Sequence, residues 1–291
     1  MSTKLGVLVI HGMGDPPADF AAAVTARLRR QLGQLAARVE VEPCFWSPIL
    51  QLHQHEIWRR MQHGRSRMHL QRAREWIVSA LGDPVGYLSG YFQDGQPVYA
   101  KIHECVRSSL AKLEARLPTG EVTPLAILAH SLGSVIISNY IWNEERDSGE
   151  LVPIGPRTTT ADLRRQHSGV GTTPFERMET LTTFVTYGSN IPLFLPPVKI
   201  TECIKFPRDS LPVAYRAVAR WVNMYDEYDV LGYPLGDLWD EGHGTQIDDV
   251  TMAAGPWPVS MTPLSHTHYH DTERFVEDVV AEVRRVLRVV K

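Results

Sequence analysis

Short runs of apolar residues, each followed by a turn rich in glycine or polar residues, predict the strands of this chain. They span residues 5–10, 39–46, 125–129, 181–187 and 218–225. Several of these runs are apolar without a polar residue at every second position, which is typical of strands buried on both faces of a parallel sheet. In residues 20–35 and 275–287, apolar residues recur every three or four positions and predict amphipathic helices. The order of these elements predicts an α/β fold, with a mostly parallel sheet flanked by helices.

Residues 47–117 interrupt the alternation of strands and helices. Their pattern is helical and rich in arginine, and Gly82-Asp83-Pro84 and Gly95-Gln96-Pro97 divide it. We expect a cap-like helical insertion within a single domain that spans residues 1–291. Residues 149–174 have no periodicity and predict a long surface loop, while residues 226–250 form an acidic segment without lysine or arginine.

Charge and composition narrow the class of protein. Thirty Lys and Arg stand against 33 Asp and Glu, for a net charge of −3, and no basic arm is present. Nucleic acid is therefore not an expected partner. No apolar run is long enough to cross a bilayer, and the first residues lack the features of a cleaved signal peptide, so we expect a cytoplasmic protein without a transmembrane segment.

The three cysteines and the glycine-rich turns do not indicate a cofactor or a disulfide framework. Cys44, Cys105 and Cys203 are widely spaced, which predicts reduced, structural thiols. None of them lies in a strand-to-helix turn suited to a nucleophile. The chain has no phosphate-binding loop and no dinucleotide-binding glycine motif, and we expect no cofactor.

The strongest chemical signal is Ala129-His130-Ser131-Leu132-Gly133, between a predicted buried strand and a predicted helix. In a nucleophile elbow the turn is so sharp that small residues are needed two positions before and after the serine. Here Ala129 stands where glycine is usual. The same five residues would also fit an ordinary strand-to-helix turn.

A second glycine-rich turn, His11-Gly12-Met13-Gly14, follows the first predicted strand. Acyl transfer needs two backbone N–H groups aimed at the oxygen that becomes negatively charged. The N–H groups of Met13 and of Leu132, at the start of the helix after Ser131, are the expected pair.

Val9–Gly14 together with Ala129–Gly133 resembles the serine esterases and lipases of the α/β-hydrolase superfamily. The sequence is especially similar to small bacterial lipases, in which Ala also occurs at the first elbow position. The resemblance implies the α/β-hydrolase fold and a chain order of nucleophile, acid and base, with Ser131 as the nucleophile.

The same resemblance suggests the other two members of a triad. The segment from Tyr225 to Leu235 is similar to the family's acid-bearing turn and implies Asp229 as the acid, with Asp226 as the alternative. The family's histidine precedes a tyrosine by three positions, which selects His266, with His268 as the alternative. The string from His266 to Asp271 would also suit a metal such as zinc, although we expect no metal site.

The expected substrate is a small-molecule or lipid ester. Asp83–Tyr87 is similar to a segment of larger intracellular phospholipase-like members of the superfamily. With the apolar stretch from Ile191 to Val198, it suggests an acyl pocket whose arginine-rich rim could contact an anionic lipid surface. Arginines on a helix are also a common solvated face. Thioesterase and acyltransferase activities would use the same site, and a non-catalytic binding protein is the alternative from another class.

Overall fold

The protein is described by a computed structural model, which covers residues 4–62, 78, 82–87, 92–93, 96–145, 171–195, 203–239 and 244–290. Most of the predicted loop at 149–174 lies outside these residues. So do Arg65, Arg67, Arg72 and Arg74 of the insertion, and the end of the apolar stretch at Pro196–Val198.

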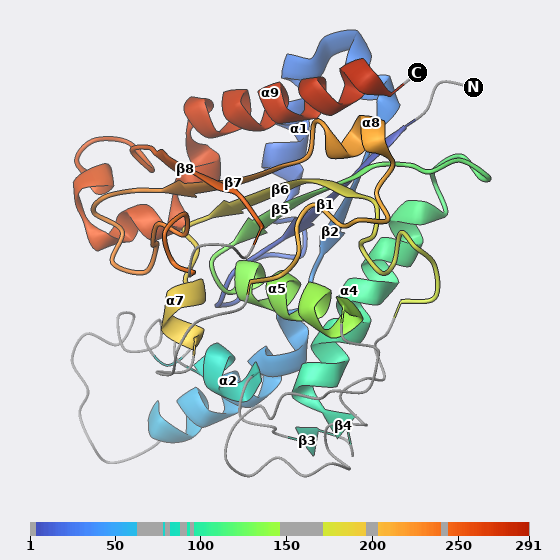
Figure 1. Cartoon of the computed structure of the whole chain (residues 1–291). Helices are drawn as coiled ribbons and strands as arrows, with labels where there is room; N and C mark the ends of the chain where they lie inside the picture. Colours follow the sequence, from blue (N-terminus) through green and yellow to red (C-terminus); the bar gives the residue numbers. More distant parts are fainter. Residues whose placement is uncertain are drawn as a thin grey trace.

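Six parallel strands form one sheet, in the spatial order β2-β1-β5-β6-β7-β8. Their bounds are β1 Leu5–Ile10, β2 Val39–Cys44, β5 Leu125–His130, β6 Leu181–Tyr187, β7 Arg220–Tyr225 and β8 Ile247–Thr251. The predicted α/β class and the parallel sheet are therefore confirmed (Figure 1).

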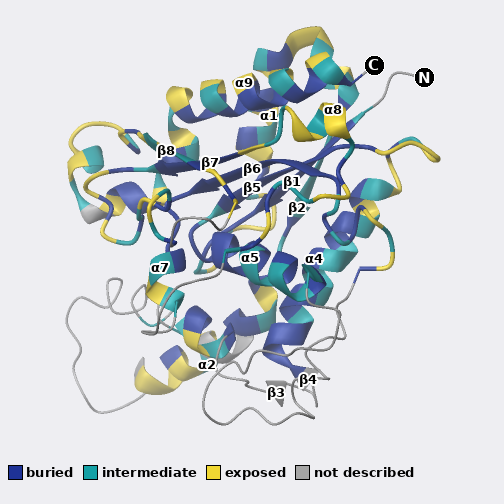
Figure 2. Cartoon of the chain, in the orientation of Figure 1, coloured by how far each residue is buried: buried dark blue, intermediate teal, exposed yellow. Residues whose placement is uncertain are grey.

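Helices cover both faces of the sheet. Figure 1 shows α1 and α9 on one side and α4 and α5 on the other. The α-helices are α1 Ala22–Leu32, α2 Pro48–Gln62, α4 Val98–Glu114, α5 Leu132–Glu145, α7 Ile191–Phe194, α8 Val213–Arg216 and α9 Glu273–Val289. The apolar stripe of α9, which includes Phe275 and Val279, packs with Val24 and Leu28 of α1. The outward face of α9 is exposed (Figure 2).

Part of the predicted insertion belongs to the flanking layers. Helix α4 packs against β1 and β2, and its Ile102 and Val106 are fully buried in the same core as Leu8. Helix α2 packs on α4, and a helical segment at residues 82–87 and two short strands, β3 Phe92–Gln93 and β4 Gln96–Pro97, lie between them in sequence.

Strand β8 was not expected, because its residues lie in the acidic segment. Only Ile247 of this edge strand is buried, so the apolar signal is weak. Its two aspartates have partners instead of facing only water: Asp248 binds Arg220, and Asp249 accepts hydrogen bonds from Asn223 and from the Leu235 and Gly236 amides.

Because all six strands are parallel, their carboxyl ends lie at one edge of the sheet. The segments that follow β1, β5, β6 and β7 therefore meet there, together with the short 3₁₀ helices η3 Val259–Met261, η4 Pro263–Thr267 and η5 Tyr269–Asp271 before α9. None of the helices in the described part of the chain is long and apolar enough to cross a membrane.

Candidate active site

Ser131 lies in the sharp turn between β5 and α5. Its φ of 50° is in the left-handed region, which is strained for a residue other than glycine. Such strain costs roughly 1–3 kcal/mol and is concentrated at functional sites. Gly133 permits the turn because an added Cβ there would come within 2.7 Å of the His11 carbonyl oxygen. The small residue at this position therefore lets α5 approach the end of β1.

One chain of hydrogen bonds joins Ser131, His266 and Asp229. The Ser131 Oγ lies 2.8 Å from Nε2 of His266. On the other side of the ring, Nδ1 of His266 lies 2.8 Å from Oδ2 and 3.0 Å from Oδ1 of Asp229. All three residues are buried, although 135 residues separate the serine from the histidine.

Asp229 is held as a carboxylate by several donors. The Leu231 amide donates to its Oδ1 at 2.9 Å, and the Tyr269 hydroxyl donates to its Oδ2 at 2.8 Å. Burial alone would raise the pKa of Asp229, but the hydrogen bond and charge of His266, with the other donors, outweigh it and lower the pKa below its usual value. The carboxylate can therefore accept the Nδ1–H of His266 and fix the tautomer that leaves Nε2 free to take a proton.

Asp226, the alternative acid, has a different set of partners. Its Oδ1 accepts from the Tyr228 amide at 2.8 Å, and its Oδ2 accepts from the Ala254 amide at 2.6 Å. The carboxylate thus joins the turn after β7 to the turn after β8. Both aspartates are buried, so neither is a solvated loop residue.

The other two histidines of the string His266–His270 have a different partner, Asp271. The His268 ring pairs with Asp271, with Nδ1 and Oδ2 2.9 Å apart, at a more exposed position. Nε2 of His270 lies 3.8 Å from the same carboxylate. Among the residues that the structure describes, no three metal-ligating side chains converge.

The glycine-rich turn after β1 lies against Ser131. A Cβ added at Gly12 would be 2.7 Å from the Ser131 Cβ and 3.2 Å from its Oγ. The neighbouring Met13 is partly buried, and Leu132 is the first residue of α5, where backbone N–H groups lack partners within the helix. The segment that carries Met13 therefore lies next to the serine, and Leu132 follows Ser131 directly in the chain.

His11 at the start of this turn is neutral. Its Nδ1–H donates to the Gly12 carbonyl at 2.7 Å, and its Nε2 accepts from the amides of Trp46 and Ser47 at 3.2 and 3.4 Å. Burial lowers the pKa of His11 to about 4, although the bond to Gly12 opposes the shift.

Three further residues at the site were not expected from the sequence. Asn190, fully buried after β6, places Nδ2 at 3.4 Å from the Ser131 Oγ, and its Oδ1 has no partner within the described residues. His130 donates from Nε2 to the His266 carbonyl at 2.8 Å. In the sequence, Tyr269 only helped to select His266 through the spacing of the two residues. In the structure, its hydroxyl binds Asp229 directly. The signal for Asn190 was its position at the carboxyl end of a strand.

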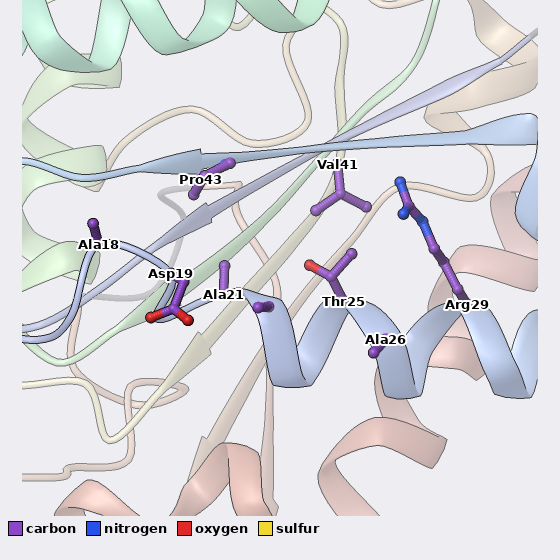
Figure 3. A pocket seen from close by; sticks show the side chains of 9 residues that line it. Ala18, Asp19, Ala21, Thr25, Ala26, Arg29, Val41 and Pro43 are labelled. Atoms are coloured by element: carbon purple, nitrogen blue, oxygen red, sulfur yellow. The ribbon is translucent and has the colours of Figure 1, made fainter.

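Of the arginines between residues 53 and 74 that were expected to form a rim, the structure describes Arg59 and Arg60. Arg59 and Arg60 of α2 both pair with Glu56 at exposed positions. A surface pocket of about 390 Å³ lies elsewhere, between α1 and the edge strand β2 (Figure 3). Thr25, Arg29, Val41 and Pro43 are among its lining residues, and Ser131, His266 and Asp229 are not.

Neither a protein-family model nor a curated protein sequence matches the chain.

Proposed function

We propose that this protein is a serine hydrolase of the α/β-hydrolase fold that cleaves carboxylic esters. The observation that carries the proposal is the unbroken chain of hydrogen bonds from Ser131 through His266 to Asp229. It supports activation of the serine because a hydroxyl is a weak nucleophile until an adjacent base can remove its proton.

In the proposed reaction, His266 Nε2 takes the proton of Ser131 as Oγ forms a bond to the ester carbonyl carbon. The Met13 and Leu132 N–H groups bind the resulting oxyanion. The bond to the alkoxy group then breaks, and His266 gives its proton to the leaving alcohol. Water, activated by His266, hydrolyses the acyl-enzyme in the same way, and Asp229 stabilises the imidazolium in both steps.

Exposed apolar side chains in the segment before His266 support a substrate with an apolar acyl group. Trp257, Met261 and Leu264 precede His266 and are 80%, 52% and 65% exposed. Exposed apolar side chains in the segment that carries His266 support contact with an apolar ligand and are compatible with peripheral contact to lipid. Thioesterase or acyltransferase chemistry would use the same nucleophile, as set out above.

The test is hydrolysis of p-nitrophenyl esters of increasing acyl length, with Ser131→Ala as the control. Where deacylation is slow, we expect an initial burst of p-nitrophenol, because acylation releases it while the acyl-enzyme accumulates. In Ser131→Ala we expect kcat at least ~10³-fold lower. Equal turnover by the folded variant would contradict the proposal. Absence of turnover on oxygen esters with rapid cleavage of thioesters would favour a thioesterase, and absence of both would favour a binding protein.

A further inference from the structure

A buried carboxylate in the insertion holds the glycine-rich turn after β1. The Gly14 amide donates to Oδ2 of Asp83 at 2.6 Å, across 69 residues of sequence. Asp83 is fully buried in the helical segment 82–87. Gln51 of α2 donates from Nε2 to both oxygens of the same carboxylate, at 3.3 and 3.4 Å. Asp83 therefore binds Gly14 directly, and Gln51 supports the same carboxylate.

The peptide between Gly12 and Met13 is held as well. The carbonyl of Gly12 accepts from Nδ1 of His11, whose other ring nitrogen is occupied by the Trp46 and Ser47 amides. In a trans peptide the C=O and the next N–H point in opposite directions. A Gly12 carbonyl that points at His11 therefore directs the Met13 N–H away from His11.

His11 holds the carbonyl of the Gly12–Met13 peptide, which carries the Met13 N–H, and Asp83 holds the N–H of the next peptide, Met13–Gly14, so both peptides of Met13 are restrained. Gly14 has a φ of +96°, a conformation open to few other residues, and glycine turns change backbone direction readily. The bond from Gly14 to Asp83 opposes reorientation of the Met13–Gly14 peptide, which follows directly on the peptide that carries the Met13 N–H. An oxyanion site depends on donors that are already oriented before the charge develops.

We propose that Asp83 is a positioning residue that holds the Met13 N–H in the orientation that binds the oxyanion. This inference rests on the proposed function. It makes the ester-cleaving activity depend on the docking of the 82–87 segment and of α2 against the turn, so the insertion acts on the reaction as well as shaping the surroundings of the site.

The test compares Asp83→Ala, Asp83→Asn and Gln51→Leu with the wild-type protein. Asp83→Ala removes the acceptor of the Gly14 N–H, and we expect kcat to fall at least ~10-fold while KM changes less than ~3-fold, because the oxyanion is bound only as the reaction proceeds. Asp83→Asn keeps one acceptor oxygen and should restore most of kcat. Gln51→Leu should lie between Asp83→Asn and Asp83→Ala.

A trifluoromethyl ketone gives a second measurement, since its adduct on serine carries the oxyanion. We expect its inhibition constant to rise in step with the fall in kcat/KM along the series. Glu144→Ala is the matched control, because Glu144 is a buried carboxylate that accepts the Gly171 amide at 2.9 Å near the end of α5, far along the helix from Ser131. This control should lose thermal stability and keep its kcat.

The outcomes separate the two proposals. An active wild-type protein together with a folded Asp83→Ala variant of unchanged kcat would overturn the role of Asp83 alone. Equal losses of kcat in Asp83→Ala and Glu144→Ala would do the same, by showing a general structural effect. If Asp83→Ala does not fold, Asp83→Asn and Gln51→Leu provide the test. An inhibition constant that does not rise as kcat/KM falls in these two variants would overturn the role of Asp83. A wild-type protein without hydrolysis or inhibitor adduct overturns the proposed function and this role with it.

Discussion

The two sides of the candidate site are held in different ways. On the side of β7 and α9, Asp229 and His266 bind each other, and Tyr269 and Leu231 that support Asp229 lie a few residues from one or the other. On the side of β1, the Gly12–Gly14 turn is held by partners from distant segments, namely Trp46, Gln51 and Asp83 through His11 and Gly14. The first side is built from residues close in sequence to Asp229 or His266, and the second depends on residues 46–51 and on Asp83.

On the side of β7 and α9, the largest expected difference in kcat is between variants of two histidines, His266 and His268. Replacing His266 by Ala removes the base bound to Ser131, and kcat should fall at least ~10³-fold. Replacing His268 by Ala removes only the pair with Asp271, and kcat should stay within about twofold, since exposed ion pairs contribute little. Steady-state kinetics of the two variants measures this. The reverse order would make His268 the base.

The two aspartates provide the next comparison. Asp229→Asn disturbs the tautomer of His266, and we expect kcat to fall by about 10²–10⁴-fold with the fold retained. Asp226→Asn weakens the hold on the Tyr228 and Ala254 amides, which should lower the free energy of unfolding by about 1–3 kcal/mol and leave kcat within about threefold. Kinetics and urea unfolding of both variants distinguish them. A greater loss of kcat in Asp226→Asn would exchange their roles.

Acid should lower the free energy of unfolding through His11, on the side of β1. The pKa of His11 is about 4 in the folded protein and about 6.5 when exposed. Between these values the unfolded state binds more protons, so the free energy of unfolding should fall as the pH decreases from about 6.5 to about 4, by about 3 kcal/mol from His11. Burial beside His266 and His270 also lowers the pKa of His130, which adds in the same direction.

Urea unfolding at several pH values measures this loss. The lowered pKa of Asp229 contributes stability that is lost only at more acidic pH, below its usual value of 3.8, so the two windows are separate. His11→Gln should flatten the dependence between pH 6.5 and 4. Stability that does not change over this range in the wild-type protein would show that His11 is not buried and neutral.

The smallest expected effect is at Tyr269. Its hydroxyl donates to Asp229 and accepts from the Asp226 amide at 2.8 Å, so Tyr269→Phe should lower the free energy of unfolding by about 1–2 kcal/mol and reduce kcat less than ~10-fold. Tyr187→Phe is the control, because the Tyr187 hydroxyl has no hydrogen bond within the described residues. Equal behaviour of the two variants would dismiss the contribution of the hydroxyl.

The sequence predicted the strands that are rich in apolar residues, since burial on both faces leaves an uninterrupted apolar run. The predicted strand at residues 181–187 matches β6 at both ends. Strand β8 was missed because its carboxylates find partners in Arg220 and Asn223, which are distant in sequence. An edge strand needs less apolar surface, so its signal is weak.

The residues of the site also differ in whether the sequence could predict them. Ser131 and the turn at His11–Gly14 could be found because each follows a buried strand, and the choice between neighbouring acids and histidines came from a resemblance. The position of Asn190 after a strand indicated only that it lies at the edge of the sheet. Its contact with Ser131, like the bond from Gly14 to Asp83, could not be predicted, because each depends on which segments meet in space at this edge. Contacts across 59 or 69 residues leave no local pattern in the sequence.

The central claim, an activated serine, is tested most directly by reaction with a fluorophosphonate probe, followed by mass spectrometry of the peptides. The probe requires an activated nucleophile and an oxyanion site but not the natural substrate. The account predicts one adduct, on Ser131, that is absent from Ser131→Ala and much slower to form in His266→Ala. A folded wild-type protein that forms no adduct, or forms it at another residue, would contradict the claim.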